Sequence, residues 1–207
     1  NLAVSVNARY LELLGKPSKI PENGYHGADI IETARAIIEQ DGDRYLQLDE
    51  AERLVIFKNR AYEEKLKALK RDLENFNVTY DKWFSERSLH PEAICEACEI
   101  LKANGNIYEE DGALWLKSSA YGDDKDRVVI RDNGVPTYLA ADIAYHKNKY
   151  ERGFKKMINI WGADHHGYVA RVKAAMEALG FDADKLEILL LQMVSLFRNG
   201  ELVKMSK

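Results

Sequence analysis

The stretch INIWGADHHGY, residues 158–168, places a carboxylate and two adjacent histidines directly after an apolar run. Gly162 lets a planar group or a phosphate approach the backbone, and free N–H groups at the start of a following helix attract anions. Gly162, Asp164 and His165 therefore predict a nucleotide site. Two alternatives remain open on spacing alone: Asp164, His165 and His166 could be metal ligands, or the two histidines could be polar residues that cap the helix. Adjacent histidines rarely point the same way, which disfavours the metal.

A second group of polar side chains lies in TYLAADIAYH, residues 137–146. Tyr138, Asp142 and either Tyr145 or His146 recur three or four residues apart, so they share one face of a helix. A carboxylate with a phenol one turn away suits a cationic ligand, because aspartate accepts two parallel N–H bonds from a guanidinium group. On spacing alone, a core tyrosine and an ordinary surface aspartate explain the pair better.

A third signal is the segment NGELVKMSK, residues 199–207. Asn199-Gly200 predicts a tight turn, after which Lys204 and Lys207 stand three residues apart. Two such lysines could hold a polyphosphate and neutralise the charge that develops on it during a displacement reaction. Taken alone, a basic segment of this kind is most often a solvated tail.

The elements that position these groups follow from hydrophobic periodicity. From residue 138 onward, helical patterns alternate with apolar strands, which predicts parallel βαβ units in which ligands bind beyond the carboxyl ends of the strands. Before residue 138 the pattern is helical and then β-rich, with Asp-Gly, Gly-Asp and Asn-Gly turns. The predicted elements are helices at 2–15, 27–40, 49–75, 91–105, 138–153 and 166–180, strands at 78–86, 156–162 and 186–197, and a small antiparallel insert within 107–138.

Composition is that of a packed globular protein. Hydrophobic residues make up 46% of the 207 residues, charged residues 31%, and the net charge is −4. No apolar run approaches the roughly 18 residues of a membrane span, so we expect a cytoplasmic protein that does not enter a membrane. Cys95 and Cys98 lie in the predicted helix 91–105, where we expect them to serve packing rather than metal or redox chemistry.

Taken in chain order, three segments closely resemble bacterial arginyl-tRNA synthetases. They are YLAADIAYH, INIWGADHHGYVARVKAAMEALG and LLLQMVSLFRNGELVKMSK, and the last one ends in a tetrad that resembles the KMSK lysine loop of class I aminoacyl-tRNA synthetases. The stretches DKWFSERSL and DGALWLKSSAYGDDKDRVVIRDNGVPTY also look like that family. The resemblance covers nearly the whole chain.

The resemblance implies an α/β fold: a partial Rossmann-like nucleotide-binding fold with a parallel sheet, a helical N-terminal part and a small β-rich connective insert. It also implies an arginine–tRNA ligase, which joins L-arginine to tRNA(Arg) through an arginyl-adenylate made from ATP, with Mg²⁺. The residue roles that it implies are arginine binding by Tyr138, Asp142 and His165, ATP binding by Gly162, Asp164, His165, Met205 and Ser206, phosphate stabilisation by the catalytic residues Lys204 and Lys207, and no protein metal site.

One family feature is missing. Class I enzymes pair the lysine loop with a His-x-Gly-His motif, and the nearest match, His26-Gly27, has no second histidine. We therefore expect an internal fragment that lacks the N-terminal and anticodon-binding domains and is inactive alone. Another class I synthetase, a related nucleotidyltransferase and a non-catalytic RNA-binding fragment remain alternatives. The expected divisions are a helical part at 1–77, a core strand region at 78–90, the connective insert at 91–137, and the second half of the Rossmann-like core at 138–207.

Overall fold

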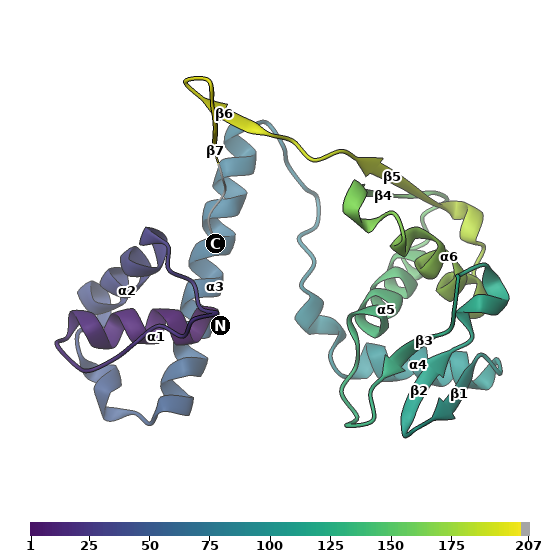
Figure 1. Cartoon of the computed structure of the whole chain (residues 1–207), viewed down its shortest axis with the longest axis horizontal. Coiled ribbons are helices and arrows are strands. Elements are labelled where there is room, and N and C mark those ends of the chain that lie inside the picture. Colours follow the sequence, from purple (N-terminus) through teal and green to yellow (C-terminus); the bar gives the residue numbers. More distant parts are fainter. Residues whose placement is uncertain (204–207) are drawn as a thin grey trace. The chain divides into compact units, whose positions relative to one another are not determined.

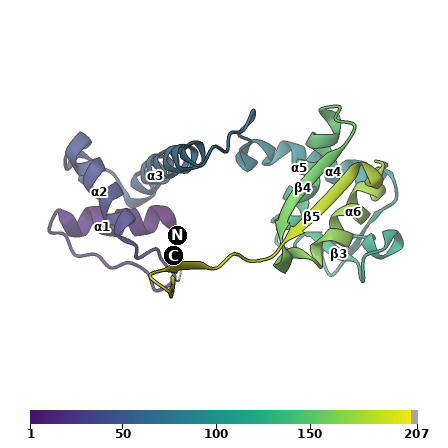
Figure 2. The same ribbon diagram turned by 90° about the horizontal axis from the view of Figure 1, so that it is seen from above.

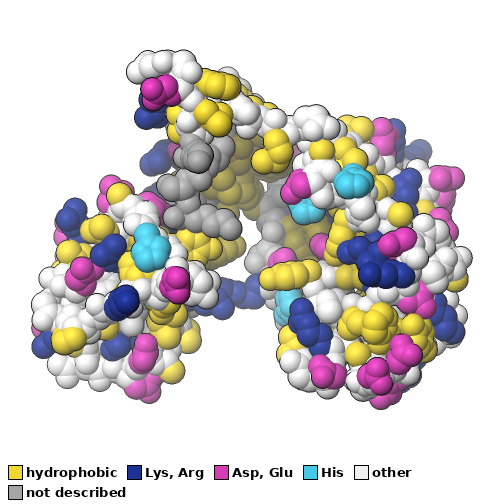
Figure 3. Space-filling view, viewed as in Figure 1, with side chains coloured by type: hydrophobic (Ala, Val, Ile, Leu, Met, Phe, Trp, Pro, Cys, Tyr) yellow, Lys and Arg dark blue, Asp and Glu magenta, His cyan; other side chains and the backbone are white. Residues whose placement is uncertain are grey.

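The computed structural model describes residues 1–203, and the chain divides into two compact units (Figure 1). One unit holds Asn1–Lys82 and the segment that begins at Leu196; the other holds Trp83–Ser195. On the face shown in Figure 3, lysine and arginine side chains are interspersed with aspartate and glutamate. None of the helices in the described residues is long and apolar enough to cross a membrane.

The first unit is built on three helices, α1 (Leu2–Leu13), α2 (Ala28–Asp41) and α3 (Glu50–Asn75), which confirms the three helices predicted there. A short 3₁₀ helix, η1 (Arg44–Gln47), precedes α3. The aromatic rings at the centre of the unit meet edge to face, with centroids 4.8–6.2 Å apart, an arrangement that the ring quadrupoles favour. The buried core comprises Val6, Tyr10, Ile30, Ala34, Ile37, Tyr45, Phe57 and Ala61.

Helix α3 begins at a capping box. The Asp49 side chain accepts a hydrogen bond from the Glu52 N–H at 2.8 Å, and the Glu52 carboxylate accepts one from the Asp49 N–H at 3.4 Å. These bonds satisfy two backbone donors that the first helical turn leaves without partners. Only the first half of α3 contributes buried side chains, so the second half is the solvated, charged helix that its composition predicts.

The strand predicted at 78–86 is wrong. The structure has irregular backbone there, followed by the 3₁₀ helix η2 (Glu86–Leu89). Seven of the nine positions are exposed and two are half-buried, so the alternating side chains have no buried face to point towards. A period-2 pattern stabilises a strand only where one of its faces is covered.

The antiparallel insert is confirmed. It follows helix α4 (Glu92–Ala103) and contains β1 (Ile107–Glu110), β2 (Ala113–Leu116) and β3 (Arg127–Ile130) in the order β1-β2-β3. A tight Asp111-Gly112 turn joins β1 to β2, with both residues at positive φ. The short 3₁₀ helix η3 (Ser118–Tyr121) lies between β2 and β3. On α4, Cys98 packs against the core and burial raises its pKa to about 11, whereas Cys95 is exposed.

The remainder of the second unit is a βαβ core. Helix α5 (Tyr138–Glu151) leads to β4 (Met157–Gly162), and η4 (Ala163–His165) and α6 (Tyr168–Ala178) lead through η5 (Ala183–Lys185) to β5 (Leu186–Leu191). Strands β4 and β5 pair in parallel, as predicted (Figure 2). Met157 and Asn159 are buried on one face of β4, while Ile158 and Ile160 on the other face are exposed.

The predicted strand at 186–197 is too long. Strand β5 ends at Leu191, and residues after a short irregular segment form a separate hairpin of β6 (Leu196–Arg198) and β7 (Glu201–Val203). The predicted tight turn is present there, with Asn199 at φ 53° and Gly200 at φ 83°. An apolar run alone cannot show where one strand stops and the next begins.

Candidate functional site

The candidate site begins where β4 ends. Because β4 and β5 are parallel, their carboxyl ends lie at the same edge, and η4 and the start of α6 continue directly beyond it. Gly162 precedes η4, and a Cβ at this position would lie 2.5 Å from Asp164 Oδ1. A glycine at this bend is therefore what allows the Asp164 side chain to fold back over the backbone.

A cavity of roughly 430 Å³ opens at this edge. Three of the predicted site residues, Tyr138, Asp142 and His165, line it together with Trp161 and Tyr168. Tyr138 is 83% exposed, so it belongs to the rim, whereas Asp142 is half-buried. The helix face predicted from spacing and the loop after β4 thus meet at one cavity.

Asp142 is the ionisable group that this cavity partly encloses. Burial raises its pKa, while a hydrogen bond from Tyr168 and the charges of Lys149 and His165 act in the opposite direction. Burial also raises the pKa of Tyr168, with the Asp142 charge contributing, so the phenol keeps its proton and donates to the carboxylate. The result is a carboxylate held by one neutral donor and open to a cationic partner.

Asp142 also lines a second cavity, of roughly 180 Å³. The other residues around it are Phe84, Glu86, Ala141 and Tyr145. Glu86 and Asp142 are therefore two acidic groups around one cavity, and the charge of Glu86 raises the pKa of Asp142. The sequence interpretation missed Glu86 because it lies in the segment that was expected to be a strand.

From spacing alone, either Tyr145 or His146 could share the face of α5 that carries Tyr138 and Asp142. His146 is 3% exposed and lines neither cavity; its Nδ1 donates to the Asp142 carbonyl oxygen at 2.7 Å. Its Nε2 accepts from the Asn159 amide at 2.7 Å, and Lys149 donates to Asn159 Oδ1 at 2.8 Å. Burial lowers the His146 pKa to about 4, so the ring is a neutral link between α5 and β4.

Of the other residues at the bend, Gly162, Asp164 and His166 do not line the cavity, and His165 lines it from an exposed position. Asp164 and His165 are exposed, with the carboxylate 3.6 Å from His165 Nε2, and His166 is exposed as well. The capping alternative is wrong, because the residues at the N-caps of η4 and α6 are Gly162 and Gly167. In residues 1–203, no cluster of three or more His, Cys, Asp or Glu side chains could hold a metal ion.

The lysine tetrad cannot be placed. Lys204, Met205, Ser206 and Lys207 lie outside the described residues, so their predicted phosphate contacts stay predictions.

Trp161 and Tyr168 were not predicted. Trp161 ends the apolar strand and Tyr168 opens the next helix, and the centroids of their rings lie 6.1 Å apart. In the sequence they are simply aromatic residues on either side of the loop that follows the strand. This pattern indicates a binding site only when the strand end is known to border a cavity.

A parallel strand pair joined through helices, with a cavity beyond its carboxyl edge, defines an α/β domain of the kind in which ligands bind at that edge. The family model described as "tRNA synthetases class I (R), catalytic domain" matches residues 29–205, and the chain belongs to that family.

Two curated relatives carry the name arginine–tRNA ligase. The protein from Heliobacterium modesticaldum is 55% identical and the one from Carboxydothermus hydrogenoformans 57% identical over 208 residues. Each comparison covers 100% of this chain and 37% of the relative. The chain therefore spans little more than a third of the length of these relatives.

Solved structures agree with the predicted fold class. A structure from Campylobacter jejuni described as an arginyl tRNA synthetase has a TM-score of 0.88 and 42% identity, covering 100% of this chain and 46% of that one. The Thermus thermophilus arginyl-tRNA synthetase, at 20% identity and a TM-score of 0.60 over 92% of this chain and 39% of that one, shows likeness of fold alone. The expected α/β fold is confirmed.

Proposed function

We propose that the complete protein containing this chain joins L-arginine to tRNA(Arg) in two steps. In the first, the α-carboxylate of arginine attacks the α-phosphorus of ATP, a P–O bond breaks, and pyrophosphate leaves. In the second, a ribose hydroxyl at the end of the tRNA attacks the acyl carbon, and AMP leaves. Because such charging takes place in the bacterial cytoplasm, we assign the complete protein to that compartment.

The observation that carries this proposal is the Asp142 carboxylate in the larger cavity. An aspartate accepts two parallel N–H bonds from a guanidinium group, which no ammonium group can supply in the same plane. Trp161 and Tyr168 add aromatic surface that attracts a cation. In this proposal Tyr138 contributes at the rim, and His165 stands where the arginine and the nucleotide meet.

The second half of the proposal concerns ATP. We assign the adenylate to the bend formed by Gly162, Asp164 and His165, since it lies beyond the carboxyl ends of two parallel strands. Mg²⁺ is treated as part of the substrate, bound to the phosphates of ATP. Lys204 and Lys207 would neutralise the charge that builds on the phosphates, with Met205 and Ser206 completing the loop.

Arginine-dependent exchange of pyrophosphate into ATP tests the proposal in the complete protein. Asp142→Asn keeps the size of the side chain but removes its charge, so we expect the KM for arginine to rise about 100-fold while the KM for ATP changes little. Asp184→Asn replaces an exposed aspartate of the same unit and serves as the matched control. An equal loss for arginine and ATP would show that Asp142 does not bind the guanidinium group.

The same assay separates the rival class I enzymes. If another amino acid supports exchange in the unchanged protein and free arginine does not compete with it, the chain belongs to a ligase with a different substrate.

A further inference from the structure

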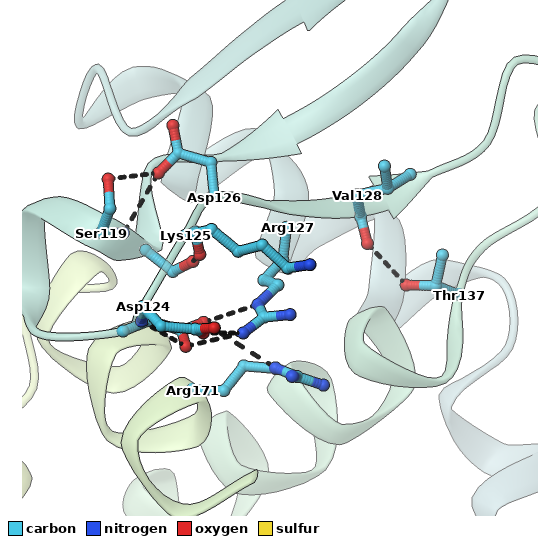
Figure 4. A network of polar contacts seen from close by, with 10 residues as sticks. Ser119, Asp124, Lys125, Asp126, Arg127, Val128, Thr137 and Arg171 are labelled. Carbon is cyan, nitrogen blue, oxygen red and sulfur yellow. Dashed lines mark hydrogen bonds and ion pairs between the residues drawn. The ribbon is translucent and has the colours of Figure 1, made fainter. Parts of the chain in front are cut away.

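A buried acidic group joins the β-rich insert to helix α6. Asp123, which follows η3, is 7% exposed and accepts two bonds from the Arg127 guanidinium, at 2.8 and 2.9 Å. Arg171 of α6 approaches the same carboxylate, with its Nε 3.8 Å from Asp123 Oδ2. Figure 4 shows Arg171 close to Arg127 and Asp124 in this network. The Arg127 guanidinium beside it holds the pKa of Asp123 well below its usual range, so the carboxylate stays charged.

Arg171 makes a second contact along its own helix. Its guanidinium carbon lies 4.6 Å from the centroid of the Tyr168 ring, one turn earlier on α6. Its Nε is buried without a hydrogen-bond partner among the described residues. The position of the guanidinium therefore depends on the Asp123 charge on one side and on the face of the Tyr168 ring on the other.

Tyr168 carries this restraint into the candidate site. Its ring forms part of the wall of the larger cavity, and its hydroxyl is hydrogen-bonded to Asp142. A tyrosine in the first turn of a helix can rotate about χ1 unless a neighbour fixes its ring. Arg171 is the neighbour that covers the ring from the side of the insert.

We propose that Arg171 is a positioning residue for arginine recognition, through which Asp123 and Arg127 of the insert fix Tyr168 against Asp142. This inference rests on the proposed function. Without the cation above its ring, Tyr168 loses its fixed orientation, and the Asp142 carboxylate loses a donor that aims it. We therefore expect the affinity for arginine to fall while the affinity for ATP is kept, because the lysines proposed to bind the phosphates belong to another part of the sequence.

The test is a double-mutant cycle of R171M and Y168F in the complete protein, measured by arginine-dependent pyrophosphate exchange. We expect R171M to raise the KM for arginine about fivefold, as a partly buried cation–π contact allows, with the KM for ATP within about twofold of its original value. Because Arg171 acts through Tyr168, adding R171M to Y168F should cause little further change, whereas independent residues would give multiplied effects.

Arg152→Met is the matched control, since Arg152 also lies over an aromatic ring, Phe154, at 5.6 Å, but away from the cavity. It should leave the KM for arginine unchanged. Multiplied effects in the double variant, or equal rises in both KM values, would overturn the inference. If R171M does not fold, R171Q, which keeps a polar side chain and removes the cation, should still raise the KM for arginine, and an unchanged KM overturns the inference. Absence of exchange in the unchanged protein with tRNA(Arg) present refutes the proposed function instead.

Discussion

Asp142 and His146 lie one turn apart on α5, and burial pushes both towards their neutral forms. For Asp142 the pKa rises, so a function that needs the carboxylate weakens with falling pH sooner than it would with an exposed aspartate. For His146 the pKa falls, which suits its task, because a neutral ring donates from Nδ1 and accepts at Nε2. Burial thus raises the pKa of the acid and lowers the pKa of the base, because it disfavours the charged form of each.

We expect His146 to make the second unit sensitive to acid. Its pKa is about 6.5 when unfolded and about 4 when folded, so the unfolded chain takes up a proton first, and stability falls as the pH drops from about 6.5 to about 4. The loss is about 3 kcal/mol. All three tryptophans lie in this unit, so urea unfolding followed by their fluorescence measures it.

Two variants isolate this effect. His146→Gln should flatten the pH dependence, at the cost of lower stability at neutral pH, because the link to Asn159 is weakened. His166→Gln replaces an exposed histidine of the same unit and should leave the pH dependence intact. If both variants behave alike, the acid sensitivity arises elsewhere.

At the scale of the elements, helices are the part of the fold that periodicity predicted well. Each predicted helix is present, because each has an apolar face that packs against a neighbour. Both errors concern strands. Residues 78–86 alternate but are mainly exposed, and the run 186–197 is apolar throughout but breaks after Leu191. Strand pairing depends on partners distant in sequence, which a local pattern does not contain.

The start of α3 provides a test at this scale. Asp49→Ala removes the acceptor of the capping box, so we expect the free energy of unfolding of the helical unit to fall by about 1 kcal/mol. Far-ultraviolet circular dichroism during urea unfolding measures it. Asp43→Ala, before η1, removes an aspartate that makes no side-chain cap bond and should cost clearly less. Equal losses at the two positions would contradict the assigned role of the cap.

The candidate site was partly predictable for a related reason. Spacing placed Tyr138 and Asp142 on one helix face, and the pattern placed His165 beyond a strand end. Their meeting at one cavity, and the walls formed by Trp161 and Tyr168, depend on how α5 packs against β4 and α6. Packing of this kind is a tertiary property, and single-residue types carry little signal for it.

At the scale of the molecule, one face of the β4–β5 sheet carries exposed apolar side chains among the described residues. Parallel sheets are normally buried on both sides, yet Ile158 is 54% and Ile160 64% exposed. Leu189, Leu190 and Leu191 of β5 are also exposed. A contiguous apolar surface of this kind favours association.

We therefore expect the 207-residue chain to bind a hydrophobic dye such as ANS and to self-associate. Ile160→Lys should reduce both, because the charge interrupts the apolar face without touching the buried side of β4. Val55→Lys, at a position of similar exposure on α3, is the control and should change neither. Dye fluorescence and light scattering give the two readouts, and equal effects of the two variants would contradict the prediction.

Within residues 1–203, every residue that lines the larger cavity falls between Tyr138 and Tyr168, in a single helix–strand–helix passage of the chain. The surface that we propose selects the amino acid is therefore supplied by one short, continuous stretch of the sequence. Recombination could exchange that piece as a cassette between related ligases while the lysine tetrad downstream stayed in place. Substrate preference and phosphate chemistry could then diverge separately in evolution.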